Sequence, residues 1–219
     1  MNDRLIQVSR EGTSVNASTA EIRTAAAQFA AAGVLKLRSF LDPHLRDVLL
    51  DLVDRADFAR RIHDGIGTEL CALPGLASGT LELLMNDAAL HAAIAALTQA
   101  DHIGCFEGRI YRLVPGTDHH DSWHSDVGDD RLVAMSVNLS RGSTEGGTLE
   151  IRRASSPEVI SQMTNPTPGD AVIFRIDPTL RHRVSAVTGG APRTAYAGWF
   201  RRSPDFSALV RPQYSAHPS

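Results

Sequence analysis

The spacing of apolar residues along the chain changes near residue 103. Before that point apolar residues recur every three or four positions and alanine is frequent. After it, short apolar runs alternate with Gly, Pro, Asp and Asn. Helical spacing indicates amphipathic helices, and short runs bounded by turn-forming residues indicate strands. We therefore predict a helical first part and a β-rich second part.

Three helices are predicted in the first part. The first begins at Ser18, which forms a capping box with Glu21, and ends at Gly33. The second begins after Asp42, whose side chain suits a helix start. The third covers about residues 80–99, where leucine and isoleucine recur at helical intervals.

The rest of the first part has weaker signals. Residues 34–37 read as a short strand, and residues 1–16 look poorly structured. Residues 60–80 contain glycines, one proline and few periodic apolar positions, so we expect a loop or lid there.

Seven strands are predicted in the second part. They are Cys105–Val114, Ser122–Val127, Leu132–Leu139, Gly147–Arg152, Ala171–Arg175, His182–Val187 and Thr194–Phe200. Many short strands at such intervals indicate a sandwich or barrel, of which a jelly roll is one form. The helices are then expected to pack on one outer face and cover the sheet.

Composition narrows the class of protein. The 219 residues suit one domain, and 42% hydrophobic residues suffice for a sizeable core. The net charge of -3 gives no global attraction to nucleic acid or anionic membranes, and no run is apolar enough to span a bilayer. Cys71 and Cys105 are too few for a disulfide framework; they could pair, but buried free thiols are favoured. With no signal peptide in the N-terminal sequence, a cytoplasmic location is expected.

Two histidines and one carboxylate form a candidate metal site. His124 and Asp126 are two apart, so on a strand both would point to the same face, and His182 would come from a later strand that folds back beside them. Two neutral imidazoles and a carboxylate suit Fe(II) and leave other coordination positions open. The same set also accepts Mn, Co, Ni or Zn.

A second His-x-Asp sequence, His119 to Asp121, competes for this role. It lies in a polar run that reads as a loop, whereas His124 follows the apolar Trp123 in a strand-like setting. We therefore favour His124 and expect His119 and His120 at the rim. The other histidines, which include His63, are expected at ordinary surface or core positions.

Several short motifs follow one another in order through the second part. They are Arg109-Ile110-Tyr111 with Gly116, Trp123-His124-Ser125-Asp126, Val137-Asn138-Leu139, Gly146-Gly147-Thr148-Leu149, Pro168-Gly169-Asp170-Ala171-Val172-Ile173-Phe174, His182-Arg183-Val184, and Gly190 to Arg193, closing with Trp199. This ordered set resembles the 2-oxoglutarate/Fe(II)-dependent dioxygenases, especially their prolyl-4-hydroxylase-like branch. The resemblance implies a double-stranded β-helix, which is a cupin-like jelly roll, with the N-terminal helices packed on one sheet.

The change near residue 103 and the resemblance together predict a domain organisation. Residues 1–219 would form a single oxygenase domain. It would comprise a helical part with one or two short strands at 1–103, a catalytic jelly roll at 104–202 and a C-terminal tail at 203–219.

Roles for individual residues follow from the resemblance. His124, Asp126 and His182 would be the catalytic metal ligands. Arg193 would pair with the distal carboxylate of 2-oxoglutarate, because a guanidinium donates two parallel hydrogen bonds. Tyr111 matches a tyrosine that helps to bind this co-substrate.

The pocket and one departure from the family can also be predicted. Trp199 and Phe174 would wall the pocket. Many relatives carry Ser or Thr two positions after the arginine, where this chain has Ala195. Thr194 should point to the opposite face of the strand, so Tyr111 or a water would have to serve as the second donor.

The activity implied is that of an oxygenase using Fe(II), 2-oxoglutarate and O2, with ascorbate as a possible support. It would hydroxylate an unactivated C–H bond of a small molecule or amino-acid-like substrate and release succinate and CO2. The presence of Asp126 favours hydroxylation over halogenation, although desaturation or ring formation can use the same ligands. No nucleic acid or membrane partner is expected, and the sequence leaves the oligomeric state open.

Two other functions remain possible from the residues. One is a metal-dependent cupin-type enzyme that does not use 2-oxoglutarate, and the other is a non-catalytic metal- or ligand-binding jelly roll. Arg193 argues against the first, which needs no carboxylate anchor at that position. The presence of all three metal ligands together with Arg193 argues against the second.

Overall fold

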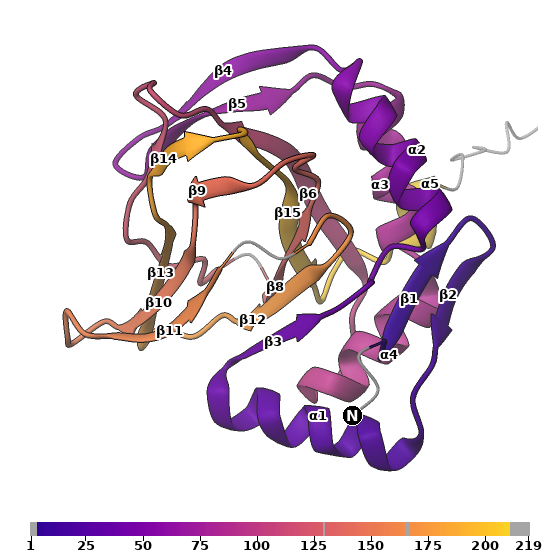
Figure 1. Cartoon of the computed structure of the whole chain (residues 1–219). Helices are drawn as coiled ribbons and strands as arrows, with labels where there is room; N and C mark the ends of the chain where they lie inside the picture. Colours follow the sequence, from indigo (N-terminus) through magenta and orange to yellow (C-terminus); the bar gives the residue numbers. More distant parts are fainter. Residues whose placement is uncertain (1–3, 129, 165–166, 211–219) are drawn as a thin grey trace, which may run out of the picture.

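The computed structural model describes residues 4–128, 130–164 and 167–210. Figure 1 shows strands curling around a central space, with helices α1 to α4 gathered on one side. The helices are α1 Thr19–Ala32, α2 Pro43–Asp54, α3 Leu76–Met85, α4 Ala88–Thr98 and α5 Phe206–Val210. Of the predicted C-terminal tail, α5 belongs to the described part and residues 211–219 lie outside it.

The predicted helix starts are confirmed. The Ser18 hydroxyl accepts from the backbone of Glu21, and the Glu21 side chain accepts from the backbone of Ser18, which satisfies two free donors at the start of α1. Gly33 ends α1 in a left-handed conformation, with φ 70°. Asp42 caps α2 by accepting from two backbone N–H groups.

Most strands belong to one large antiparallel sheet or to a smaller sheet facing it. The strands are β1 Ile6–Ser9, β2 Gly12–Val15, β3 Val34–Leu37, β4 Phe58–His63, β5 Gly67–Ala72, β6 Cys105–Leu113, β7 His120–Asp121, β8 Arg131–Asn138, β9 Thr144–Gly146, β10 Leu149–Arg153, β11 Val159–Met163, β12 Ala171–Arg175, β13 Leu180–Val184, β14 Val187–Gly190 and β15 Arg193–Arg201. The large sheet has the order β3-β12-β8-β15-β6-β5-β4, with β7 paired to β5. The smaller sheet has the order β11-β10-β13, and β14 pairs with β9.

This arrangement confirms the predicted mainly β jelly roll with helices packed on one sheet. Alternate residues of β6, β8 and β15 face the helices and join one large core cluster with α1 to α4. The opposite residues of these strands face the smaller sheet, where further apolar clusters lie. The helices therefore close one face of the large sheet, and the other face is left to line an interior cavity.

Three predictions about the first part were wrong. Residues 6–15 form a β-hairpin, β1–β2, although residues 1–16 were expected to be poorly structured; residues 1–3 lie outside the described part. The expected loop at 60–80 is mostly the hairpin β4–β5 followed by α3, because β5 extends the large sheet beyond β6. The expected helix at 80–99 is two helices, since Asn86 leaves the helical path and bonds the backbone of Phe106 through both ends of its side-chain amide.

Several strands of the second part also differ from the prediction. The strand expected at His182–Val187 is split between β13 and β14, and β7, β9 and β11 were not predicted. In β11 the side chains alternate between half-buried and exposed and none is fully buried, which leaves little signal in the residue types. Both cysteines are free: Cys105 is buried, as favoured, and Cys71 is half-buried.

No single helix in the described ranges is long and apolar enough to cross a membrane. The pair α3 and α4, bent by 59° at the break between them, meets the length and composition test only when taken together.

Strands β6 and β15 approach each other closely at a pair of glycines. Gly198 pairs with Gly108, and a Cβ atom at Gly198 would lie 2.0 Å from the carbonyl oxygen of Glu107 and 2.4 Å from the Cα of Gly108. Any side chain at Gly198 must push the two strands apart, because the atoms it meets are backbone.

We predict that Gly198→Ala destabilises the protein by roughly 3 kcal/mol, through overpacking between paired strands. Urea denaturation followed by circular dichroism measures this change. The control is Gly79→Ala in α3, where a Cβ meets no atom within 4 Å and should stabilise by about 0.5–1 kcal/mol. Equal midpoints for Gly198→Ala and the wild type would contradict the proposed close contact.

Candidate metal and keto-acid site

The two sheets enclose a cavity of about 450 Å³. Its wall on the large sheet consists of the inward residues of β6, β8 and β15, among them Tyr111, Arg193 and Trp199. Its wall on the smaller sheet includes His182 and Val184 of β13. Charged and polar side chains thus line an interior space, which is typical of a ligand site.

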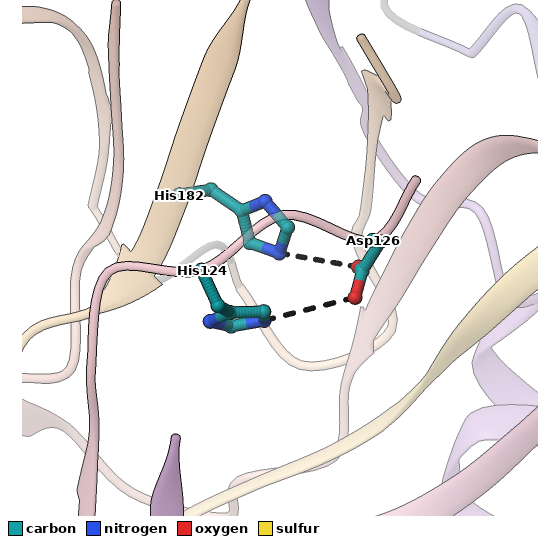
Figure 2. Close-up of side chains that lie close together, drawn as sticks. All are labelled: His124, Asp126 and His182. Carbon is teal, nitrogen blue, oxygen red and sulfur yellow. Dashed lines mark ion pairs between the residues drawn. The ribbon is translucent and has the colours of Figure 1, made fainter. Parts of the chain in front are cut away.

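Three candidate ligands come together in this cavity. Figure 2 shows His124, Asp126 and His182 pointing toward one another. Their ligand atoms all lie within 4.8 Å of one another. His182 Nε2 lies 3.2 Å from Asp126 Oδ2, and His124 Nε2 lies 3.7 Å from Asp126 Oδ1.

The predicted strand Ser122–Val127 is absent, and the chain reaches this geometry in another way. After β7 the segment makes a single antiparallel bridge, in which His124 and His182 exchange two backbone hydrogen bonds, each 3.0 Å long. The two imidazole rings then lie with their centroids 4.3 Å apart. The irregular backbone after His124 turns the Asp126 carboxylate inward, where it faces both imidazole rings. Strand alternation was expected to produce this orientation.

His124 is held in one tautomer. Its Nδ1 lies 2.7 Å from the carbonyl oxygen of Ser122, which can only accept, so Nδ1 carries the hydrogen. The same nitrogen lies 3.3 Å from a carboxylate oxygen of Asp121. Asp121 is oriented by the backbone N–H of Val184, 2.6 Å away. Nε2 of His124 is therefore left with a lone pair directed at the cavity, as a metal ligand requires.

The competing His-x-Asp sequence does not form a separate site. His119 accepts a hydrogen bond from the backbone of Val114 and braces the loop, and His120 is exposed at the cavity rim. Asp121 instead supports His124 from behind. Burial raises the pKa of Asp121, although the neighbouring histidines and Arg193 oppose this.

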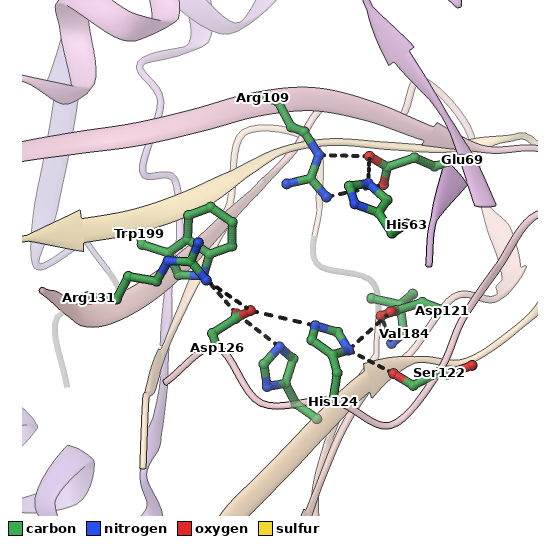
Figure 3. Close-up of polar contacts among 11 residues, drawn as sticks. His63, Glu69, Arg109, Asp121, Ser122, His124, Asp126, Arg131, Val184 and Trp199 are labelled. Atoms are coloured by element: carbon green, nitrogen blue, oxygen red, sulfur yellow. Dashed lines mark hydrogen bonds and ion pairs between the residues drawn. The ribbon is translucent and has the colours of Figure 1, made fainter. Parts of the chain in front are cut away.

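Asp126 is held as a carboxylate by its neighbours. Burial alone would raise its pKa, but hydrogen bonding and charge from His182, together with the Trp199 indole, lower the pKa to about 2. The indole Nε1–H donates to Asp126 Oδ2 over 2.7 Å. Arg131 stacks on Trp199, 3.7 Å from the ring centre, and approaches Oδ1 to 3.8 Å. Figure 3 shows this cluster beside the ligands.

The donor set fits a divalent redox metal. Asp126 is already ionised and His124 directs Nε2 at the cavity, so both can bind a metal directly. His182 Nε2 must give up the hydrogen that it shares with Asp126 Oδ2 before it can bind. His182 packs beside Phe174, with ring centroids 4.8 Å apart, which limits its rotation. Two histidines and one carboxylate on one side of an ion would leave its other positions facing the cavity.

Arg193 is a buried cation without an acidic partner. Its residue is 6% exposed, and no carboxylate in the described ranges lies within ion-pair distance of it. One guanidinium N–H donates to the hydroxyl of Tyr111, while its Nε is buried without a hydrogen-bond partner. Burying such a charge is costly unless a ligand compensates it, so the geometry fits a carboxylate bound between Arg193 and Tyr111.

The departure at Ala195 has the expected consequence. Thr194 points away from the cavity, where its hydroxyl accepts from Arg112 Nε over 3.0 Å. Tyr111 lies opposite Ala195 in the register of β6 and β15 and provides the hydroxyl at this level. Burial raises the pKa of Tyr111, so this phenol stays protonated and can donate.

Sequence reasoning missed several residues that line the cavity. Asp121 and Arg131 support the ligands, and His63, Glu69 and Arg109 form a cluster on the opposite side (Figure 3). His63 and Glu69 belong to the hairpin β4–β5, which was taken for a loop. The spacing of Asp121 three residues before His124 was the one available signal, and it was read only as a competing site.

The comparisons agree with this geometry. Residues 109–201 match the family model of the 2OG-Fe(II) oxygenase superfamily, a segment that contains all five candidate site residues. No curated protein matches the chain in sequence.

Solved structures share the fold. A prolyl-4-hydroxylase from Pseudomonas putida is 23% identical with a TM-score of 0.63, covering 83% of this chain and 99% of that one. A prolyl hydroxylase from Trichoplax adhaerens, in complex with a peptide of hypoxia inducible factor, is 16% identical with a TM-score of 0.61, covering 84% and 90%. The epimerase SnoN in complex with Fe3+, alpha ketoglutarate and nogalamycin RO is 13% identical with a TM-score of 0.58, covering 92% and 94%.

These findings confirm the resemblance read from the sequence. The superfamily is matched by the family model, and the prolyl-hydroxylase-like branch is matched in fold. The predicted cofactors, Fe(II), 2-oxoglutarate and O2, are those of this superfamily.

We predict that Trp199→Phe weakens binding of Mn(II) or Fe(II) about tenfold, because Asp126 loses the donor that orients its carboxylate. Anaerobic calorimetric titration measures the affinity. Trp123→Phe is the matched control, since the other tryptophan stacks between Arg152 and Arg183 and does not line the cavity. Equal affinities in the two variants would show that the indole hydrogen bond has no part in metal binding.

Proposed function

We propose that this protein is a 2OG-Fe(II) oxygenase that hydroxylates an unactivated C–H bond of a small molecule or amino-acid-like substrate, as the match of residues 109–201 to that family model supports. One observation carries this proposal. A cluster of two histidines and one aspartate shares a cavity with a buried arginine that has no carboxylate partner in the described part of the chain. A metal site alone explains the first feature, and only an acidic co-substrate explains the second.

His124, Asp126 and His182 would hold Fe(II) in this proposal. Bound Fe(II) and 2-oxoglutarate supply the oxidising power for O2-dependent chemistry, in which the keto acid becomes succinate and CO2. The protein orients the three ligands and holds His124 and Asp126 in the protonation state that metal binding requires. Ser122 and Asp121 hold the hydrogen of His124 on Nδ1, and the neighbours of Asp126 keep its carboxylate ionised.

Arg193 would bind and orient the far carboxylate of the keto acid. Its burial excludes water from the guanidinium, so a carboxylate there forms strong, directional hydrogen bonds. The Tyr111 hydroxyl lies against the guanidinium and offers a further donor to the same carboxylate. When the far carboxylate is fixed, the position of the keto-acid end relative to the metal ligands is fixed as well.

The presence of Asp126 supports hydroxylation as the outcome. Its carboxylate occupies the third ligand position, where related halogenases carry a small residue that leaves room for halide. Trp199 contacts one oxygen of this carboxylate and Arg131 approaches the other, which holds the group in place. With a substrate of this protein, labelled O2 is therefore expected to deliver one labelled oxygen atom to the product, as mass spectrometry measures.

Two alternatives remain as competing proposals. A cupin-type metal enzyme that does not use 2-oxoglutarate, or a non-catalytic ligand-binding jelly roll, would also use the fold. The buried and unpaired Arg193 favours the oxygenase over both, because neither alternative requires an anion at that place.

We predict that anaerobic Fe(II) and 2-oxoglutarate together produce a visible metal-to-ligand charge-transfer band. His124→Ala should abolish the band by removing a ligand. Arg193→Ala should raise the 2-oxoglutarate concentration needed by about 100-fold, because two charge-assisted hydrogen bonds are lost. For Arg193→Lys the 2-oxoglutarate concentration needed should lie between those of the wild type and Arg193→Ala, because lysine keeps the charge but lacks the two-pronged guanidinium.

The matched control is Arg112→Gln on β6. Arg112 faces away from the cavity, so this variant should form the band at the wild-type concentration. A folded, iron-loaded wild-type protein that gives no band would exclude the keto-acid proposal. It would favour the cupin-type alternative.

A further inference from the structure

The cavity also contains a cluster of charged residues that are not among the proposed ligands of the metal or the keto acid. Arg109 of β6 donates from Nε to Glu69 Oε1 over 2.7 Å and from Nη2 to Glu69 Oε2 over 3.4 Å. His63 of β4 lies 3.0 Å from the same Glu69 oxygen. Figure 3 shows this cluster across an open space from Asp126 and His124.

Glu69 orients Arg109 and leaves part of its guanidinium free. The Glu69 side chain is 9% exposed and receives a two-point contact, which fixes the plane of the guanidinium. A guanidinium has five N–H donors, and Nη1 of Arg109 has no hydrogen-bond partner among the residues described. Burial works against the charge, but Glu69 more than offsets it and raises the pKa of Arg109, so the group stays protonated.

Space for a ligand lies beside Arg109. In the sheet register Arg109 pairs with Ala197, which in turn pairs with Ser136, and both of these small residues line the cavity. Arg193 pairs with Leu113, four residues further along β6, which is about 14 Å of strand. The two arginines therefore serve different levels of the cavity, and one carboxylate does not satisfy both.

A second cation, Arg61, adds positive charge to the part of the cavity beside Arg109. Arg61 of β4 pairs with Glu69 in the hairpin register, lines the cavity and makes no ion pair within the described ranges. Glu107 also lines the cavity, but its carboxylate is paired with Arg201. Arg61 and Arg109 therefore leave an excess of positive charge over Glu69, and this end of the cavity favours an anion. Arg60, which precedes Arg61 in the sequence, points to the other face of β4 and pairs with Asp118 outside the cavity.

We infer that Arg109, held by Glu69, binds a free carboxylate of the primary substrate. This inference rests on the proposed function and narrows its substrate class to small carboxylic acids, such as free amino acids, in preference to residues within a peptide. The carboxylate would accept from Nη1 of Arg109, with Arg61 contributing charge at the rim. The remainder of the substrate would lie over Ala197 and Ser136, facing the metal ligands.

The test measures binding without turnover. Wild-type protein is loaded anaerobically with Fe(II) and 2-oxoglutarate and titrated with the free L-amino acids and their N-acetyl derivatives, each paired with its primary carboxamide. Calorimetry gives the affinity, and perturbation of the charge-transfer band reports binding beside the metal. At least one acid should bind about tenfold or more tightly than its amide, as expected for a hydrogen bond to a charged group.

Variants then locate the contact. Arg109→Gln should lose the preference for the acid and keep the wild-type affinity for 2-oxoglutarate, and that affinity also shows that the variant is folded. Arg109→Lys keeps a charge beside Glu69 and should retain part of the preference. Arg60→Gln removes the same charge from the outer face of β4 and should behave like the wild type.

Each other result overturns the inference. Equal binding of acids and amides, failure of every acid to bind, or equal effects in Arg60→Gln and Arg109→Gln would exclude a carboxylate at Arg109. A loss of 2-oxoglutarate affinity in Arg109→Gln would assign the residue to the co-substrate. Absence of the charge-transfer band in the wild type is a different failure, because it removes the proposed function and this inference with it.

Discussion

The site depends on the reciprocal pair of backbone hydrogen bonds between His124 and His182. This single bridge joins the irregular segment after β7 to the smaller sheet, and it brings together two imidazoles that are far apart in the sequence. Asp121 strengthens the same junction, since it accepts from the backbone of Val184 and approaches Nδ1 of His124. The contacts that close the fold here also determine which nitrogen of His124 faces the cavity.

The cavity carries a charge that folding alone does not satisfy. Arg193 is buried, its Nε has no hydrogen-bond partner, and no carboxylate among the described residues pairs with it. This arrangement costs stability that a ligand of opposite charge returns. Further along the same sheet, Arg109 and Glu69 form an ion pair that leaves guanidinium donors of Arg109 unused. We infer that these two parts of the cavity bind different molecules, the co-substrate at Arg193 and the substrate at Arg109.

Much of this could be predicted from the sequence where chemistry and periodicity coincide. The Ser18 cap, the stop at Gly33 and the jelly roll were predicted correctly because local rules and tertiary structure agree there. The five candidate site residues do line one cavity, although His124 and Asp126 reach it from an irregular segment where a strand was expected. The hairpin β4–β5 was missed because its inward residues are charged: Arg61, His63 and Glu69 face a polar cavity, so the strands lack the apolar alternation that predicts a half-buried sheet. The break between α3 and α4 depends on Asn86 bonding to Phe106, a long-range contact with no local signal.

The most direct measurement is a crystal structure of the protein grown anaerobically with Mn(II), as an inert substitute for Fe(II), and 2-oxoglutarate. We expect one metal ion bound by His124 Nε2, Asp126 and His182. The keto-acid end should lie on that ion, with the far carboxylate on Arg193 and the Tyr111 hydroxyl. A metal bound elsewhere, or a keto acid whose far carboxylate lies on Arg109 and not on Arg193, would contradict the proposed site.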